Sequence, residues 1–106
     1  MKALCIKQPF ASMIANGEKT IELRTWKTNY RGKLLIVASR FPKRKGLPSG
    51  KGICIVELKD CRKMCELDVE LSCCDYSDTY YSWIFKKIRK LENPIEIRGR
   101  LGIFDV

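Results

Sequence analysis

The most constraining feature of the sequence is the apolar run "KLLIVAS", residues 33–39, which is bounded on both sides by turn-forming residues. "NYRG" precedes it at residues 29–32, and a stretch containing Pro, Gly and Ser follows it at residues 40–51. Successive side chains of a strand point to opposite faces, so an entirely apolar strand needs cover on both faces. The run therefore predicts a buried strand inside a sheet.

Other short runs of strand character recur along the chain, separated by Gly, Pro and polar residues, and no internal repeat is visible. Strands are expected at residues 2–7, 19–26, 33–39, 52–64, 95–98 and 101–106. The "YSWIFKKIRKL" stretch at 81–91 fits either an amphipathic helix or a strand. The acidic stretch at 66–81 reads as a loop or an insertion, with room for a short helix.

One helix is expected directly after the first strand. Pro9 suits its first turn, apolar residues recur on one side at helical spacing, and Gly17 suits its end. Many short strands with one or two short helices predict a mainly β, α+β fold. We expect a small, partly closed β-barrel with the helices packed at its ends. The 106 residues fit a single domain covering 1–106.

The net charge of +9, from 21 basic and 12 acidic residues, favours a polyanionic partner. Nucleic acid is the first candidate and an anionic membrane surface the second, and a basic protein without such a partner is the alternative. The two basic groups are Arg40, Lys43, Arg44 and Lys45 in one loop, and Lys86, Lys87, Arg89, Lys90, Arg98 and Arg100 near the end. Charge runs are usually solvated faces, but two that flank one cleft would form a track for phosphates.

The first ten residues lack the apolar run of a secretory leader, and no segment has the length needed to span a bilayer. We therefore expect a cytoplasmic protein that does not insert into a membrane. Disulfides rarely persist in that compartment. The six cysteines are Cys5, Cys54, Cys61, Cys65, Cys73 and Cys74. Cys5 and Cys54 lie in apolar runs and are interpreted as small buried hydrophobic residues.

No C-x-x-C pair and no His occur, and adjacent cysteines seldom both reach one metal, so neither a metal site nor a cofactor is expected. The absence of His also removes Ser-His and Cys-His nucleophile pairs. Acid–base chemistry would have to use Lys, Glu, Asp, Tyr or Cys.

Lys19, Glu22 and Arg24 form the most suggestive polar group. Glu22 and Arg24 are two residues apart, so on a strand they share a side. The three residues can form a surface ion-pair ladder, which would contribute little. They can also line a polar cleft, in which the carboxylate accepts a hydrogen bond from a base amino group and the cations hold a phosphate or carbonyl oxygen.

Aromatic and helix-terminal residues lie close to this group. Trp26 and Tyr30 can offer stacking surfaces for single-stranded nucleic acid, although Trp26 is equally suited to core packing. Gln8 and Pro9 open the expected helix, whose free N–H groups favour an anion, or Pro9 only shapes the turn.

The motifs resemble those of the ASCH (activating-signal-cointegrator homology) family, and the resemblance spans nearly the whole chain. The residues that carry it are Gln8-Pro9, the G-x-K-x-x-E-x-R run at 17–24, Trp26, Arg31-Gly32 and the apolar strand at 34–39, then Trp83, Pro94, Gly99, Gly102 and Phe104. The resemblance implies a PUA-like β-barrel and an RNA-related ligand in a cleft beside the first helix, contacted by Lys19, Glu22 and Arg24.

The resemblance also implies an enzymatic alternative. Some small ASCH proteins are amidohydrolases that remove the acetyl group of N4-acetylcytidine, and their motif keeps the Lys but has a nucleophilic Thr at the position of Glu22. Other members are associated with ribonuclease activity. Lys19 and Glu22 are the candidate catalytic residues here, with Glu22 as partner or general acid–base. A third hypothesis is an adaptor that binds a protein partner through residues 66–81.

We expect an RNA- or nucleotide-binding ASCH domain, with single-stranded RNA or a modified nucleotide as the partner and a small hydrolase as the alternative. The candidate binding residues are Gln8, Pro9, Lys19, Glu22, Arg24, Trp26, Tyr30, Arg31, Arg40, Lys43 and Arg44.

Overall fold

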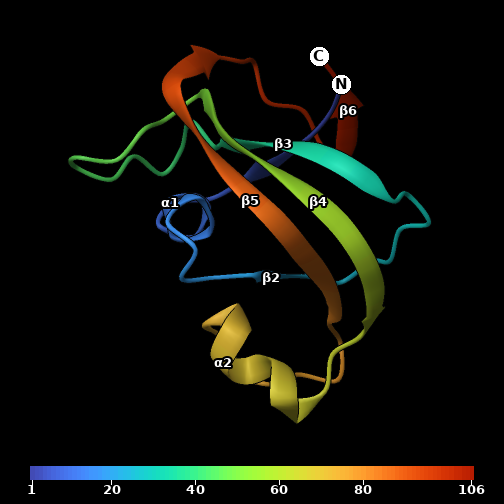
Figure 1. Ribbon diagram of the computed structural model, residues 1–106. Coiled ribbons are helices and arrows are strands. Elements are labelled where there is room, and N and C mark those ends of the chain that lie inside the picture. The colour runs from blue at the N-terminus through green and yellow to red at the C-terminus, as the bar shows by residue number, and fades with distance from the viewer.

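The computed structural model describes residues 1–106, which form a six-stranded sheet that curls around a core (Figure 1). The strands are β1 (Lys2–Ile6), β2 (Ile21–Arg24), β3 (Gly32–Ala38), β4 (Lys51–Lys63), β5 (Tyr81–Glu96) and β6 (Ile103–Asp105). Their order is β2-β5-β4-β3-β1-β6, and only the β1–β3 pair is parallel. Since β2 and β6 are edges, no backbone ladder closes the barrel, and the mainly β, partly closed barrel predicted from the sequence is confirmed.

Figure 1 shows helix α1 (Phe10–Ala15) beside the curled sheet next to β5, and helix α2 (Val69–Ser72) beyond the end of β4. Helix α1 packs Ala11 and Ile14 into the core, and Gly17 follows it with φ +82°. A short 3₁₀ turn, η1 (Glu66–Asp68), continues into α2, beyond the ends of β4 and β5. The expected helix after the first strand and the short helix in the acidic stretch are both present. Neither helix has the length and apolar character that spanning a membrane requires.

The stretch that fitted either a helix or a strand is the long strand β5. Trp83 and Phe85 alternate toward the core and are buried, which strand geometry explains. The register with β4 shifts at three places, and such irregularities bend a strand and increase its twist. The expectation of a separate strand at 95–98 is wrong. Ile95 and Glu96 are the last residues of β5, and they pair with Gly52 and Lys51 of β4. The last strand, expected at 101–106, is β6 and covers only Ile103–Asp105.

Both faces of β3 are covered, as its apolar sequence predicts. Leu34 and Ile36 belong to a core of fourteen buried residues inside the curled sheet, together with Trp83. Leu35 and Val37 belong to a smaller cluster on the opposite face. Strand β3 is thus packed against apolar side chains on both faces.

Candidate functional site

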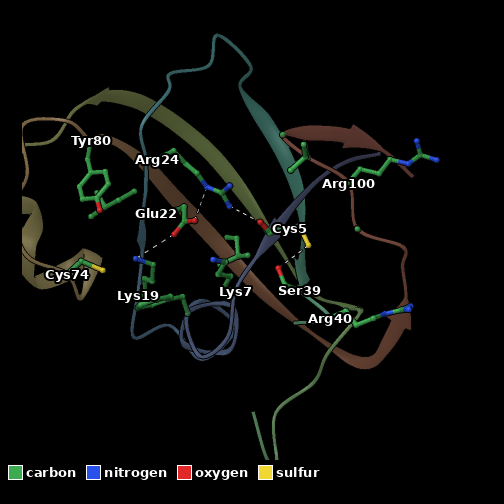
Figure 2. A pocket seen from close by; sticks show the side chains of 16 residues that line it. Cys5, Lys7, Lys19, Glu22, Arg24, Ser39, Arg40, Cys74, Tyr80 and Arg100 are labelled. Carbon is green, nitrogen blue, oxygen red and sulfur yellow. Dashed lines mark hydrogen bonds and ion pairs between the residues drawn. The ribbon is translucent and has the colours of Figure 1, made fainter. Parts of the chain in front are cut away.

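The curled sheet leaves a seam between its edge strand β2 and the end of β1, and a pocket of about 770 Å³ opens there (Figure 2). We call it the seam pocket. Its walls are the end of β1, strand β2, the start of the loop after β3, and residues 99–102 between β5 and β6. Small-molecule sites in proteins commonly have volumes of about 300–1,000 Å³, and the seam pocket falls within that range.

A chain of polar contacts crosses the seam. The Arg24 Nε donates to Glu22 Oε2 at 3.0 Å, and the Arg24 Nη2 donates to the Cys5 carbonyl oxygen at 2.7 Å (Figure 2). Cys5 lies past the last residue of β1 that pairs with β6, so its carbonyl is free to accept. Arg24 therefore joins β2 to β1 where no backbone ladder does.

Lys19 lies just before β2 rather than within it, and its side chain is only 2% exposed. Its Nζ donates to the Ser72 carbonyl at 2.5 Å, lies 3.7 Å from Glu22 Oε1, and sits 5.2 Å from the centroid of the Phe10 ring. A carbonyl oxygen, a carboxylate and an aromatic face all favour an ammonium group. Lys19 is thus a buried cation that orients Glu22.

These contacts exclude the surface-ladder interpretation of the polar group. The Glu22 side chain is 10% exposed and lies between Lys19 on one oxygen and Arg24 on the other. The carboxylate and the cations are therefore largely withdrawn from water. Their interactions are stronger in this environment than on a surface. The Lys19–Glu22–Arg24 group is a fixed charged element in the wall of the seam pocket.

The acidic stretch at residues 66–81, which we call the acidic insertion, completes the pocket on the side of Lys19. It contributes Cys74 and Tyr80 to the lining, and its Ser72 carbonyl accepts the hydrogen bond from Lys19. Asp68 anchors it to β4, accepting two hydrogen bonds from Arg62 at 2.7 and 2.8 Å, and it also accepts one from Ser82.

The hydrogen bonds from Arg62 hold the pKa of the Asp68 carboxyl well below its usual range, and in turn they raise the pKa of Arg62. The buried carboxylate therefore stays charged and keeps the insertion in place at neutral pH.

Three further cations reach the seam pocket from separate elements: Lys7 after β1, Arg40 after β3, and Arg100 between β5 and β6. Figure 2 shows Arg40 and Arg100 on the side of the pocket away from Lys19. Together with Lys19 and Arg24, they make five cations around one carboxylate, Glu22. The pocket therefore attracts anions, and its single carboxylate lies among cations.

Gln8 and Pro9 do not line the pocket. Gln8 is buried and ties the start of α1 to the basic loop, donating to Ser12 Oγ at 2.8 Å and to the Pro48 carbonyl at 2.9 Å. Its Oε1 accepts from the Ser12 backbone N–H. In this structure Gln8 positions the backbone that carries Lys7 and the loop after β3.

The remaining candidate residues lie outside the pocket lining. Trp26 is 38% exposed and packs edge-to-face on Trp83, with ring centroids 4.8 Å apart. The Tyr30 hydroxyl donates to the Lys33 carbonyl, and Arg31 donates to carbonyls of its own turn. The exposed Lys43 and Arg44 lie in the loop before β4. The structure thus brings together only Lys19, Glu22, Arg24 and Arg40 of the predicted binding residues.

The cysteines behave differently from one another. Cys54 is fully buried, as expected, and desolvation raises the pKa of its thiol to about 12. The expectation for Cys5 is wrong, because Cys5 is only partly buried and lines the seam pocket. Its Sγ lies 3.3 Å from Ser39 Oγ. The pairing of β1 with β6 stops at Leu4, so Cys5 packs against the smaller hydrophobic cluster on one side and borders the pocket on the other.

Several pocket residues escaped the sequence interpretation. Lys7 directly precedes the Gln-Pro motif, and a charge at the end of a strand beside a helix start was the available signal. The roles of the Ser72 carbonyl, Cys74 and Tyr80 have no sequence signal. They depend on how the insertion folds back over β2, where the Thr20 N–H donates to the Leu71 carbonyl.

The fold and the pocket define a small domain with a curled sheet, consistent with the PUA-like superfamily. The sequence model of the ASCH domain matches residues 4–95, and the chain belongs to this family. No curated protein matches the sequence.

Solved structures show the same fold. The crystal structure of ASCH from Zymomonas mobilis matches with a TM-score of 0.70, 14% identity, and coverage of 90% of this chain and 72% of that one. Two single-substitution variants of the Zymomonas mobilis protein each match with a TM-score of 0.65 and 15% identity. They cover 90% and 91% of this chain, and 74% and 73% of their own.

Proposed function

We propose that this ASCH domain binds single-stranded RNA or a nucleotide in the seam pocket. The observation that carries the proposal is the buried Glu22 carboxylate, held between Lys19 and Arg24 in a pocket of about 770 Å³. Family membership supports a general RNA-binding or hydrolase type of domain. The net charge of +9 supports an anionic partner.

The chemistry of the pocket suits a nucleotide better than a simple anion. A carboxylate accepts from the exocyclic amino group of a base such as cytosine, and a simple anion would be repelled by it. Arg40 and Arg100 lie on the side of the pocket away from Lys19 (Figure 2), and their guanidinium groups suit phosphate oxygens. A base near Glu22 and a phosphate near Arg40 would use both halves of the pocket.

A hydrolase acting on a modified nucleoside is the second candidate. It rests on Lys19, the lysine that the family amidohydrolases share, whose side chain lines the pocket beside Glu22. Glu22 stands at the position of the nucleophilic Thr and would act as a general base on water. Incubation with N4-acetylcytidine tests this candidate: release of acetate that Glu22→Gln abolishes supports it, and intact substrate after long incubation removes it.

Binding is tested by fluorescence anisotropy of a short labelled single-stranded RNA at low and moderate salt. The double variant Lys19→Ala, Glu22→Gln removes one positive and one negative charge, so it leaves the net charge unchanged. We expect it to lose at least about tenfold in affinity, because it removes buried charge-assisted contacts. Circular dichroism checks that it remains folded.

A matched control makes the same charge changes elsewhere. Lys59 and Glu57 form an ion pair of 3.2 Å on β4, outside the pocket, so Lys59→Ala with Glu57→Gln should leave affinity unchanged. Arg40→Ala changes an exposed residue at the rim of the pocket, so it carries little risk to folding. It should weaken binding by the amount expected for the loss of one phosphate contact. Equal binding by all variants would refute the proposal.

A further inference from the structure

A second, smaller pocket of about 340 Å³ adjoins the seam pocket, and Arg40 lines both. The segment between β5 and β6, residues 97–102, also belongs to both. Ile97 and Arg98 line the second pocket, and the next residues, 99–102, line the seam pocket. The two pockets are therefore contiguous, and one edge of both follows the same stretch of backbone.

The second pocket is polar and carries more positive than negative charge. Arg40, Lys51 and Arg98 face one carboxylate, Glu96, and Glu96 is the direct cross-strand neighbour of Lys51 in the β4–β5 ladder. Arg40 and Arg98 form no ion pair anywhere in the chain. Two guanidinium groups thus remain free for an anionic ligand.

The lining favours a phosphate over a base. Ile97 is the one hydrophobic residue of the second pocket and no aromatic ring lines it, so a base would find no stacking surface. Ser49 contributes a hydroxyl that makes no hydrogen bond within the chain. A hydroxyl and two guanidinium groups are the donors that commonly bind phosphate oxygens.

Building on the proposed function, we infer that the ligand is a polynucleotide chain rather than a single nucleotide. One nucleotide occupies the seam pocket, and the phosphate of the adjoining nucleotide binds in the second pocket at Arg98, Ser49 and the shared Arg40. The sugar-phosphate backbone of the ligand then runs along residues 97–102 of the protein from one pocket to the other. The second pocket is therefore a length-selecting subsite, because a mononucleotide carries one phosphate, and with its base beside Glu22 that phosphate occupies the seam pocket.

The test compares cytidine 5′-monophosphate with a six-residue oligocytidylate by isothermal titration calorimetry, using wild type and Arg98→Ala. Wild type should bind the oligonucleotide at least about tenfold more tightly than the mononucleotide. Arg98→Ala should remove about tenfold for the oligonucleotide and leave the mononucleotide unchanged. The slope of log K against log salt for the oligonucleotide should fall by about 0.7, the value for one lost phosphate contact on a single strand.

Arg89→Ala is the matched control, since Arg89 is exposed on β5 and lines neither pocket, and it removes the same charge. It should leave both affinities and the salt slope unchanged. Equal wild-type affinity for the two ligands, or equal effects of Arg98→Ala and Arg89→Ala, would overturn the subsite while leaving the proposed function in place. Absence of binding to either ligand would overturn both.

Discussion

Arg24 bonds to the carbonyl oxygen of Cys5 at 2.7 Å, and this contact joins β2, at one edge of the sheet, to β1, near the other. The same guanidinium donates to Glu22 at 3.0 Å. The residue that closes the barrel is therefore also the residue that orients the pocket carboxylate. Stability of the seam and binding in the pocket should respond together when this side chain changes.

Arg24→Lys tests that link. A lysine has one compact ammonium group and cannot span two acceptors with the fork geometry of a guanidinium. We expect the free energy of unfolding to fall by roughly 1–3 kcal/mol, because a buried carbonyl or carboxylate loses its donor. Urea unfolding measures this, with Arg89→Lys on the surface as the control. An unfolding curve that coincides with that of wild type would show that the seam is held by other contacts.

Lys19 and Glu22 should be energetically coupled. Lys19→Met leaves the Ser72 carbonyl unpaired and leaves Glu22 with one cation, so we expect a loss of roughly 2–4 kcal/mol of unfolding free energy. Glu22→Gln should cost less in the Lys19→Met background than in wild type, with a coupling of about 1 kcal/mol in a double-mutant cycle. Strictly additive effects would argue against an interacting pair.

Asp68 should make stability depend on pH in the acid range. Its pKa is lower in the folded than in the unfolded state, so its contribution is present above the unfolded value, about 4, and is lost as the pH falls toward the folded value. Asp68→Asn should lower the free energy of unfolding by about 1–2 kcal/mol at pH 7, because the Arg62 side chain is 43% exposed and water screens part of the ion pair.

Urea unfolding at pH 7, 5, 4 and 3 measures this dependence. The gap between wild type and Asp68→Asn should be constant from pH 7 to 5 and should narrow below about pH 4. Asp78→Asn, in the same insertion but without an ion pair, should produce no such narrowing. A gap that is unchanged at pH 3 would mean that Asp68 does not anchor the insertion through its charge.

Gly99 lies against Cys5 in the pocket wall, and a Cβ added at residue 99 would lie 2.8 Å from the Cys5 sulfur. Gly99→Ala should therefore displace residues 97–102 and weaken RNA binding several-fold. Removing the sulfur with Cys5→Ala should restore most of the affinity, because the next contact, with the Cys5 Cβ at 3.8 Å, is an ordinary one. Lack of rescue in the double variant would place the cause of the loss elsewhere.

The sequence predicts those parts of the site that depend on local spacing. The alternation of a strand is enough to place Glu22 and Arg24 on one side, and the apolar run at 33–39 is enough to predict a doubly covered strand. The prediction put Lys19 in the same strand, whereas it lies before β2 and reaches Glu22 from there.

The parts that depend on contacts between distant segments were beyond the sequence. The stretch at 81–91 fits a helix or a strand from its sequence, and only its pairing with β2 and β4 decides between them. Arg40 and Arg100 line the same pocket only because β1 pairs in parallel with β3 and also pairs with β6. Charge in the sequence indicates an anionic partner, but only the topology selects which of many cations face it.

The most direct test of the central claim is a titration of ¹⁵N-labelled protein with cytidine 5′-monophosphate, followed by the amide shifts in a two-dimensional NMR spectrum. The account predicts saturable shifts at the walls of the seam pocket, on residues 22–24, on Ser39 and Arg40, and on residues 99–102. Shifts confined to the basic loop at 41–47 and to residues 86–90, or no shifts at all, would contradict the claim that the seam pocket is the nucleotide site.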